Sequence, residues 1–155
     1  MTMREQYQIA KDEGVVYRTY IDTLGNPTGG VGHLLDWAEE LNYPEGTAIP
    51  SNIVEKWFSE DMLTSVEIAD KFLSKSDSRE LHDIITNMAF NLGETRLRKF
   101  KKMWQAIRED DFLQAAEEMK DSVWYAQVGN RSTRLYKRMV KLGERHVGST
   151  DTSIG

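Results

Sequence analysis

The sequence predicts an α+β fold in which a small glycine-rich β-hairpin accompanies a mostly helical body. Residues 15–32 combine β-branched and aromatic side chains with strong turn residues and several glycines, a pattern typical of a hairpin. From Ser51 onward, apolar residues recur at three- and four-residue spacing, which is typical of amphipathic helices. A length of 155 residues suits one domain with a real core. A long helix would join the two parts.

The hairpin is expected to follow a first helix. Residues 3–13 carry a short apolar face, and Gly14 would end that helix. Residues 15–22 then predict a strand, residues 24–27 (Leu-Gly-Asn-Pro) predict a turn, and residues 28–32 return with three glycines.

The helical part begins after an irregular or partly helical connection over residues 36–50. A long helix is expected over residues 51–74, with Ser51 as its cap and a periodic apolar stripe. Further helices are expected over residues 77–93, 96–108, 110–120, 123–127 and 130–143, followed by a frayed, flexible tail over residues 148–155.

Cysteine is absent from the chain, which excludes a disulfide framework, a thiolate zinc site and a cysteine nucleophile. The three histidines show no metal-ligand spacing, so we expect no metal site; the function inferred below implies no other cofactor. No segment has the length and apolar character of a membrane span, and the first residues lack the apolar stretch of a signal peptide. We therefore expect a protein that stays in the cytoplasm where it is made and has no stable membrane association.

Charge is distributed unevenly along the chain. The net charge is −5, but residues 1–95 hold 7 basic against 17 acidic side chains, whereas residues 96–145 hold 13 against 7. Such asymmetry is typical of a basic half that binds an acidic polymer or nucleic acid. Solvated helix faces would give the same pattern, so charge alone leaves both interpretations open.

Glu13, Asp22 and Thr28 are the candidate catalytic residues. Glu13 is expected at a helix C-terminus, where partial negative charge disfavours an anion; this suits a general acid, which must hold its proton. Asp22 and Thr28 flank the hairpin turn, so both side chains can face one concavity. Glycoside hydrolysis requires two carboxylates in unequal environments. Spacing alone leaves open the alternative that Asp22 only forms the turn.

The spacing of Glu13, eight intervening residues, Asp22, five more and Thr28 resembles the catalytic signature of the phage T4-type lysozymes, endolysins of glycoside hydrolase family 24. The similarity continues in further blocks in the same order: residues 12–14, 20–23, 28–34, 87–95 and 122–127, together with Asn130, Arg131 and Arg134. These blocks extend over most of the chain, which makes the resemblance far more specific than any single motif.

The resemblance implies a role for each matched residue. Glu13 would protonate the glycosidic oxygen, while Asp22 and Thr28 would hold and activate a water on the opposite face of the sugar, giving inversion. Arg131 matches the arginine that pairs with the catalytic glutamate in this family. This cation would orient Glu13 but would also favour its ionised form, which leaves the balance between the two effects open.

Other matched positions are expected to be structural or to bind saccharide. His33 would form an ion pair with Asp61 on the long helix. Trp124 is expected in the core or in the wall of the cleft. Five residues match positions that line the cleft and are candidates for saccharide binding, against plain packing roles: Leu34, Phe90, Asn91, Gln127 and Gly30.

The family fold implies a single lysozyme domain with a small lobe over about residues 14–60, a helical lobe over residues 1–13 and 70–147, and a cleft between them. Two departures stand out. The stretch between His33 and Asp61 is shorter than in the family, which predicts a trimmed small lobe. Gly29 replaces a bulky apolar residue, which predicts a looser hairpin.

The expected activity is hydrolysis of the β-1,4 bond between N-acetylmuramic acid and N-acetylglucosamine in bacterial peptidoglycan, by a monomeric enzyme that lyses bacterial cells. The family implies that a holin opens the membrane so that the enzyme reaches the periplasmic wall. A lytic transglycosylase, or a non-catalytic wall-binding protein on the same fold, remains an alternative. Nucleic-acid binding is not expected, because the basic residues lack a groove-reading motif.

Overall fold

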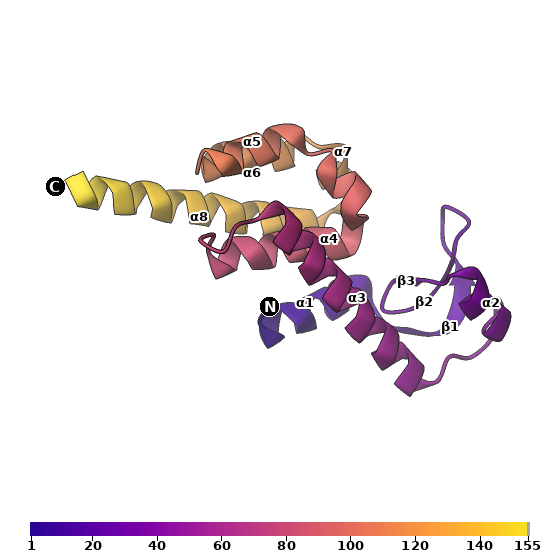
Figure 1. Ribbon diagram of the computed structural model, residues 1–155. Helices are drawn as coiled ribbons and strands as arrows, with labels where there is room; N and C mark the ends of the chain where they lie inside the picture. Colours follow the sequence, from indigo (N-terminus) through magenta and orange to yellow (C-terminus); the bar gives the residue numbers. More distant parts are fainter. Residues whose placement is uncertain (155) are drawn as a thin grey trace. The chain divides into compact units, whose positions relative to one another are not determined.

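The computed structural model describes the backbone of residues 1–154 and the side chains of residues 1–148. The chain divides into two compact units, unit 1 over Met1–Ile68 and unit 2 over Ala69–Gly155 (Figure 1). The boundary falls inside the long helix α3. The first helix groups with unit 1, whereas the sequence led us to place residues 1–13 with the helical lobe.

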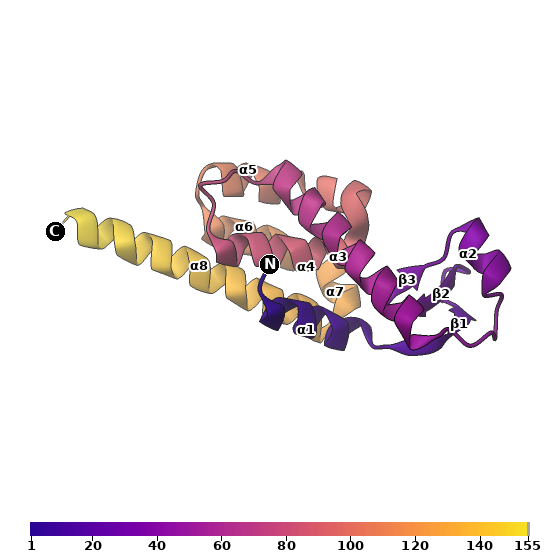
Figure 2. The same cartoon turned by 60° about the horizontal axis from the view of Figure 1, so that its bottom comes forward.

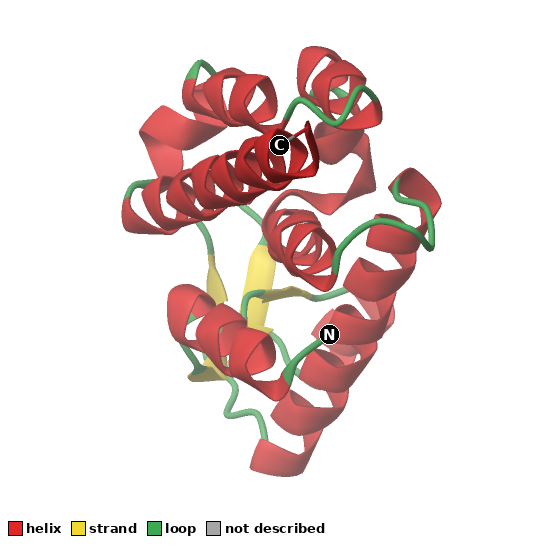
Figure 3. Ribbon diagram, turned by 90° about the vertical axis from the view of Figure 1, so that its left-hand side faces the viewer, coloured by secondary structure: helices red, strands yellow, loops and turns green. Residues whose placement is uncertain are grey.

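Unit 1 contains a three-stranded antiparallel sheet of order β1-β2-β3 with helices around it (Figure 3). Thr2 caps the first helix by accepting a hydrogen bond from the backbone N–H of Glu5, which satisfies a donor that the helix leaves unpaired. The elements are α1 (Met3–Glu13), β1 (Val16–Ile21), β2 (Pro27–Gly30), β3 (His33–Leu34), α2 (Trp37–Asn42) and α3 (Ser51–Phe72).

The side chain of Ile49 covers the hairpin at Gly29, and the looser hairpin that we expected stays a prediction. The side chain of Ile49 lies so close to Gly29 that a Cβ at this glycine would overlap its Cδ1 atom. Ile49 is buried and comes from the short connection before α3. An apolar side chain therefore does fill this position, but it comes from a different part of the chain.

Unit 2 is helical throughout the part described by the structure. Ser78 caps its first complete helix, and Gly93 interrupts that helix with φ 77° and ψ 167°, which matches the helix end expected near residue 93. The helices are α4 (Arg79–Arg98), α5 (Lys101–Arg108), α6 (Phe112–Lys120), α7 (Val123–Val128) and α8 (Asn130–Ile154), drawn from a second side in Figure 2.

Helix α8 is longer than expected, and Gly143 does not end it. A Cβ at Gly143 would lie 2.8 Å from both the side chain and the backbone nitrogen of Leu113, which belongs to α6. The glycine therefore permits close packing of two helices. The residues from Gly148 to Ile154, expected as a frayed tail, are helical, and Gly155 lies outside the described residues.

Replacing Gly143 with Ala should lower the free energy of unfolding by about 1–3 kcal/mol, because the added methyl group overpacks the contact between α6 and α8. Gly148→Ala is the matched control: the site is in the same helix with nothing within 4 Å of the added Cβ. We expect it to be neutral or to stabilise by up to about 1 kcal/mol, through helix propensity. Urea unfolding measures both, and equal effects would contradict the packing argument.

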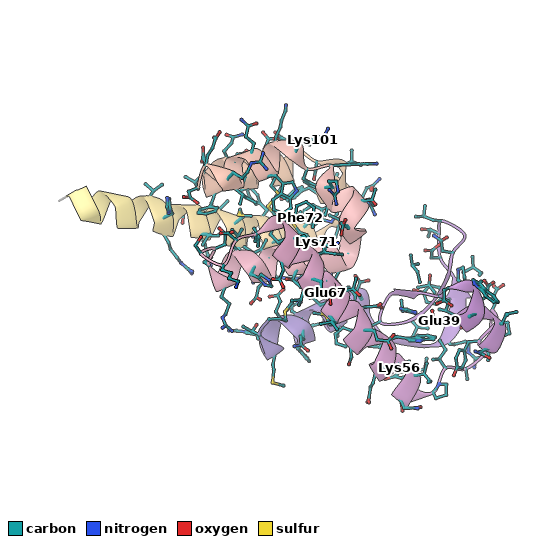
Figure 4. The ribbon with its side chains drawn as sticks, viewed as in Figure 1. Glu39, Lys56, Glu67, Lys71, Phe72 and Lys101 are labelled. Atoms are coloured by element: carbon teal, nitrogen blue, oxygen red, sulfur yellow. The ribbon has the colours of Figure 1, made fainter. Side chains whose placement is uncertain are left out.

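Aromatic and aliphatic side chains fill the core of unit 2. Phe72, at the end of α3 and labelled in Figure 4, stacks on Trp104 with ring centroids 4.6 Å apart. The Trp104 Nε1 atom donates a hydrogen bond to the backbone oxygen of Leu97, 2.9 Å away, so its polar atom is satisfied inside the core. Over residues 1–154, no helix combines the length and the apolar character needed to cross a membrane.

Candidate active site

Glu13 is the last residue of α1, and its carboxylate lies against the backbone of Gly32. Gly14, with φ 75°, turns the chain out of the helix, and its N–H donates to the oxygen of Ala10. A Cβ built at Gly32 would lie only 2.5 Å from Oε2 of Glu13. The absence of a side chain at residue 32 therefore makes room for this carboxylate beside the hairpin.

Asp22 lies directly after β1, and the hairpin turn holds its carboxylate. Its Oδ1 atom accepts hydrogen bonds from the backbone N–H groups of Asn26, at 2.8 Å, and Leu24, at 2.9 Å. The bond from the Asn26 backbone contributes most to holding the pKa of Asp22 below its usual range, because hydrogen bonds to a carboxylate favour its charged form. Asp22 thus forms the turn and also supplies an ionised acceptor there.

Thr28 is opposite Tyr20 on β1 and opposite Leu34 on β3. It is 4% exposed, and its hydroxyl donates a hydrogen bond to the backbone oxygen of Asn26, at 3.0 Å. Because this bond uses the hydroxyl proton, the Thr28 oxygen can act only as an acceptor towards a further group. Thr28 and Asp22 therefore both offer acceptors, and both are hydrogen-bonded to Asn26.

His33 joins two carboxylates, one of which the sequence analysis did not predict. Its Nδ1 lies 2.7 Å from Oδ2 of Asp61, and its Nε2 lies 2.9 Å from Oε1 of Glu39. The imidazole also stacks on Trp57, with ring centroids 4.5 Å apart. Glu39, labelled in Figure 4, comes from α2. The expected pair of His33 and Asp61 is thus extended to link β3, α2 and α3.

The network around His33 predicts a pH-dependent stability. Burial alone would lower the pKa of His33, but hydrogen bonds to Asp61 and Glu39 outweigh it and raise the pKa overall. A raised pKa in the folded state means that the stabilisation is fully present below the unfolded pKa of about 6.5. It is lost as the pH rises through the folded pKa.

The difference in the free energy of unfolding between the wild type and His33→Gln should therefore narrow as the pH rises from about 6 to about 9, through the raised pKa of His33. Chemical unfolding at each pH measures this difference. In Glu39→Gln, the pKa of His33, followed by NMR, should fall because a hydrogen-bonding anion is lost. A difference that stayed constant with pH would contradict this account.

Four predicted site residues lie in unit 2. Arg131 is 6% exposed, and its guanidinium donates to Oδ1 of Asn87 at 2.7 Å and to the Asn87 backbone oxygen at 3.3 Å. Asn91 accepts a hydrogen bond from Nε1 of the buried Trp124 at 2.7 Å, which places that indole in the core, as one of our two interpretations had it. Phe90 is half-buried, and Gln127 is exposed on α7.

In unit 1, Leu34 and Gly30 were the saccharide candidates, and their surroundings differ. Leu34 is 58% exposed, so its side chain is accessible to a ligand. Gly30 is buried, and a Cβ there would face Val54 at 3.5 Å and Trp57 at 3.7 Å, both on α3. Gly30 thus lies against a helix on the side where a Cβ would be, and the saccharide contact expected at its backbone stays a prediction.

A basic pocket lies within unit 2, with a volume of about 610 Å³. Phe100 and Trp124 contribute to its apolar wall and pack edge to face, with ring centroids 6.0 Å apart. Glu118 and Asp121 also line it, against a larger number of cationic side chains: Arg96, Lys99, Lys101 (labelled in Figure 4) and Lys102. The pocket thus locates part of the positive charge that the sequence assigns to this half.

Comparison with known proteins decides the family. A family model described as phage lysozyme matches residues 10–141. The chain belongs to the phage lysozyme family. As a phage lysozyme it is a glycoside hydrolase, and its helices with one small antiparallel sheet agree with the lysozyme-like α+β fold.

Relatives of this phage lysozyme include proteins that the match covers almost fully and much longer ones. A probable T4-type lysozyme of Dictyostelium discoideum is 30% identical, over 80% of this chain and 86% of that protein. A peptidoglycan hydrolase of Pseudomonas phage phiKMV is 29% identical over 85% of this chain but only 14% of its own length. The pre-baseplate central spike protein of Enterobacteria phage T4 is 28% identical over 87% of this chain and 27% of its own length.

Two residues near the site of this phage lysozyme were not predicted from the sequence: Glu39, the second partner of His33, and Tyr20, the neighbour of Thr28 on β1. Glu39 follows His33 by six positions, but its contact depends on the capping box at Asp36 that starts α2 and orients Glu39. Tyr20 precedes Asp22 by two positions, a spacing that places both on one face of an extended strand. This alternation could have indicated that Tyr20 lies near Asp22. Its position opposite Thr28, however, depends on the register between β1 and β2.

Proposed function

We propose that this phage lysozyme is a muramidase that hydrolyses the β-1,4 bond between N-acetylmuramic acid and N-acetylglucosamine in peptidoglycan. The observation that carries the proposal is the unequal setting of its two acids. Asp22 is held ionised by the turn beside the acceptor oxygen of Thr28, whereas Glu13 lies at a helix C-terminus against Gly32. The two acids thus lie in different settings, and the hydrogen bonds of the turn favour the charged form of Asp22.

In the proposed mechanism, Glu13 donates its proton to the glycosidic oxygen as the bond to the anomeric carbon breaks. Asp22 and Thr28 accept hydrogen bonds from a water on the other face of the sugar, and this water attacks the anomeric carbon while its proton passes to Asp22. The product then has the inverted configuration. Arg131 is proposed as the supporting cation, on the strength of the family resemblance.

Product analysis tests this proposal. Digestion of purified peptidoglycan should release fragments with reducing N-acetylmuramic acid ends, and NMR of the first products should show the α-anomer, as inversion of a β-bond requires. Anhydro-sugar ends would overturn hydrolysis in favour of a lytic transglycosylase. Binding to walls without any cleavage would overturn it in favour of a wall-binding protein. In cells, the family resemblance supports dependence on a holin for access to the wall.

The basic pocket predicts a salt-sensitive activity, because exposed cations attract an anionic wall less as salt screens them. We expect Lys99→Gln combined with Lys102→Gln to lower the rate of wall clearing about two- to fivefold at low salt and to flatten its salt dependence. Lys75→Gln combined with Lys141→Gln removes the same charge from exposed positions outside the pocket. Equal effects of the two pairs, measured by turbidity, would contradict a specific role of the pocket.

A further inference from the structure

Three residues form a row across the sheet of unit 1. Tyr20 on β1 is directly opposite Thr28 on β2, which is directly opposite Leu34 on β3. Residues paired in this way share one face of a sheet, with Cβ atoms about 4.5–5.5 Å apart in antiparallel pairs. Thr28 is therefore flanked by a phenol on one side and an apolar side chain on the other.

The outer members of this row, Tyr20 and Leu34, lie on an exposed side of the sheet. Side chains alternate between the two faces along a strand. His33, next to Leu34, stacks on Trp57 of α3, and Thr19, next to Tyr20, is buried. Tyr20 and Leu34 are by contrast 38% and 58% exposed. Tyr20 and Leu34 are thus accessible to a ligand on either side of the buried Thr28.

The hydroxyl of Tyr20 makes no hydrogen bond to any of the residues that the structure describes in side-chain detail. Partial burial, followed by the negative charges of Asp22 and Glu13, raises the pKa of the Tyr20 phenol. The phenol therefore stays protonated throughout the working pH range. The phenol is thus a hydrogen-bond donor close enough to both proposed catalytic carboxylates to interact with their charges, and it is hydrogen-bonded to neither.

We propose that Tyr20 is a further substrate-binding residue, whose phenol donates a hydrogen bond to an oxygen of the sugar lying over Thr28. The inference rests on the proposed function, because it takes its substrate from there. Hydroxyl and acetamido oxygens of amino sugars accept such a bond. The ring of Tyr20 and the side chain of Leu34 enclose the sugar from two sides, as expected for a mostly apolar site with a few fixed polar groups.

Kinetics on soluble, uncrosslinked glycan strands test the proposal. Tyr20→Phe should raise KM about five- to tenfold, as expected for loss of one hydrogen bond, with kcat within about twofold, because the bond holds ground state and transition state alike. Tyr20→Leu, which also removes the ring, should raise KM further. Tyr17→Phe is the matched control, since Tyr17 is also an exposed tyrosine of β1 but has no place in the row; its KM should equal that of the wild type.

Thermal unfolding separates binding from structure. An unchanged melting temperature in Tyr20→Phe is expected, whereas a drop that parallels the loss of activity would overturn the proposal in favour of a structural role. An unchanged KM in Tyr20→Phe would also overturn the proposed role of Tyr20. In that case, cleavage by the wild-type enzyme would still support the muramidase function.

A binding measurement removes the dependence on turnover. In a Glu13→Gln background, adding Tyr20→Phe should raise the Kd for a purified disaccharide-peptide fragment of peptidoglycan about five- to tenfold, as it should raise KM. Equal Kd values would overturn the role of Tyr20. A wild type that binds the fragment in a Tyr20-dependent manner but cleaves nothing would instead overturn the muramidase mechanism and leave the binding role supported.

Discussion

Glu13→Gln is expected to lower the rate of peptidoglycan cleavage by about 10³-fold, because a general acid contributes roughly 10²–10⁴-fold and an amide has no proton to give. The substitution keeps the size and shape of the side chain. It therefore leaves the space beside Gly32 filled as in the wild type. Turbidity of purified walls measures the rate, and far-UV circular dichroism checks that the fold is intact.

The neighbouring acid provides the matched control. Asp12 is also in the last turn of α1, but its carboxylate accepts a hydrogen bond from Gln8, 3.0 Å away within the same helix. Asp12→Asn changes the charge by the same amount one residue away, and we expect wall clearing within about twofold of the wild type, as for most surface substitutions. If the two variants clear walls equally, Glu13 is not the general acid.

Gly32→Ala is expected to lower cleavage by about 10²-fold even though it touches no reacting group. The added Cβ would lie 2.5 Å from Oε2 and 3.1 Å from Cδ of Glu13, so the carboxylate has to move. A displacement of about 1 Å at a catalytic group costs on the order of 10²-fold in rate. The φ of 62° at this residue adds a stability loss of about 1 kcal/mol, because an L side chain disfavours that conformation.

Gly46→Ala separates the two effects. Gly46 has a comparable φ of 85°, but nothing lies within 4 Å of a Cβ there. Gly46→Ala should lower the free energy of unfolding by about as much as Gly32→Ala, because both residues have a positive φ. It should keep full activity. If Gly32→Ala retains wild-type activity, or if Gly46→Ala loses as much, Gly32 does not position Glu13. Thermal unfolding and wall clearing measured on both variants decide this.

Local pattern predicted most of the helices, because their apolar spacing and caps lie within a few residues of each other. The first helix ends at Glu13 as Gly14 indicated, and α3 starts at Ser51 as expected. The roles of Gly29 and Gly143 were not predictable in this way. Each depends on a side chain from elsewhere in the chain, Ile49 or Leu113, and sequence periodicity carries no information on such contacts.

The candidate site was predicted to a different extent at each residue. The spacing of Glu13, Asp22 and Thr28, with the family resemblance, was enough to nominate them. The row of Tyr20, Thr28 and Leu34 needed the pairing register, which the turn between the strands determines and a one-residue slip would destroy. The second partner of His33 likewise depended on where α2 begins.

The hydrogen bonds that hold Asp22 have a consequence for how this enzyme can vary. The pKa of its carboxyl is lowered mainly by backbone N–H groups of the turn, above all those of Asn26 and Leu24. A backbone donor survives replacement of its own side chain by anything other than proline. Side chains of the turn other than that of Asn26, which also lowers the pKa of Asp22 through a hydrogen bond, can therefore vary while the backbone donors continue to favour the ionised form of Asp22.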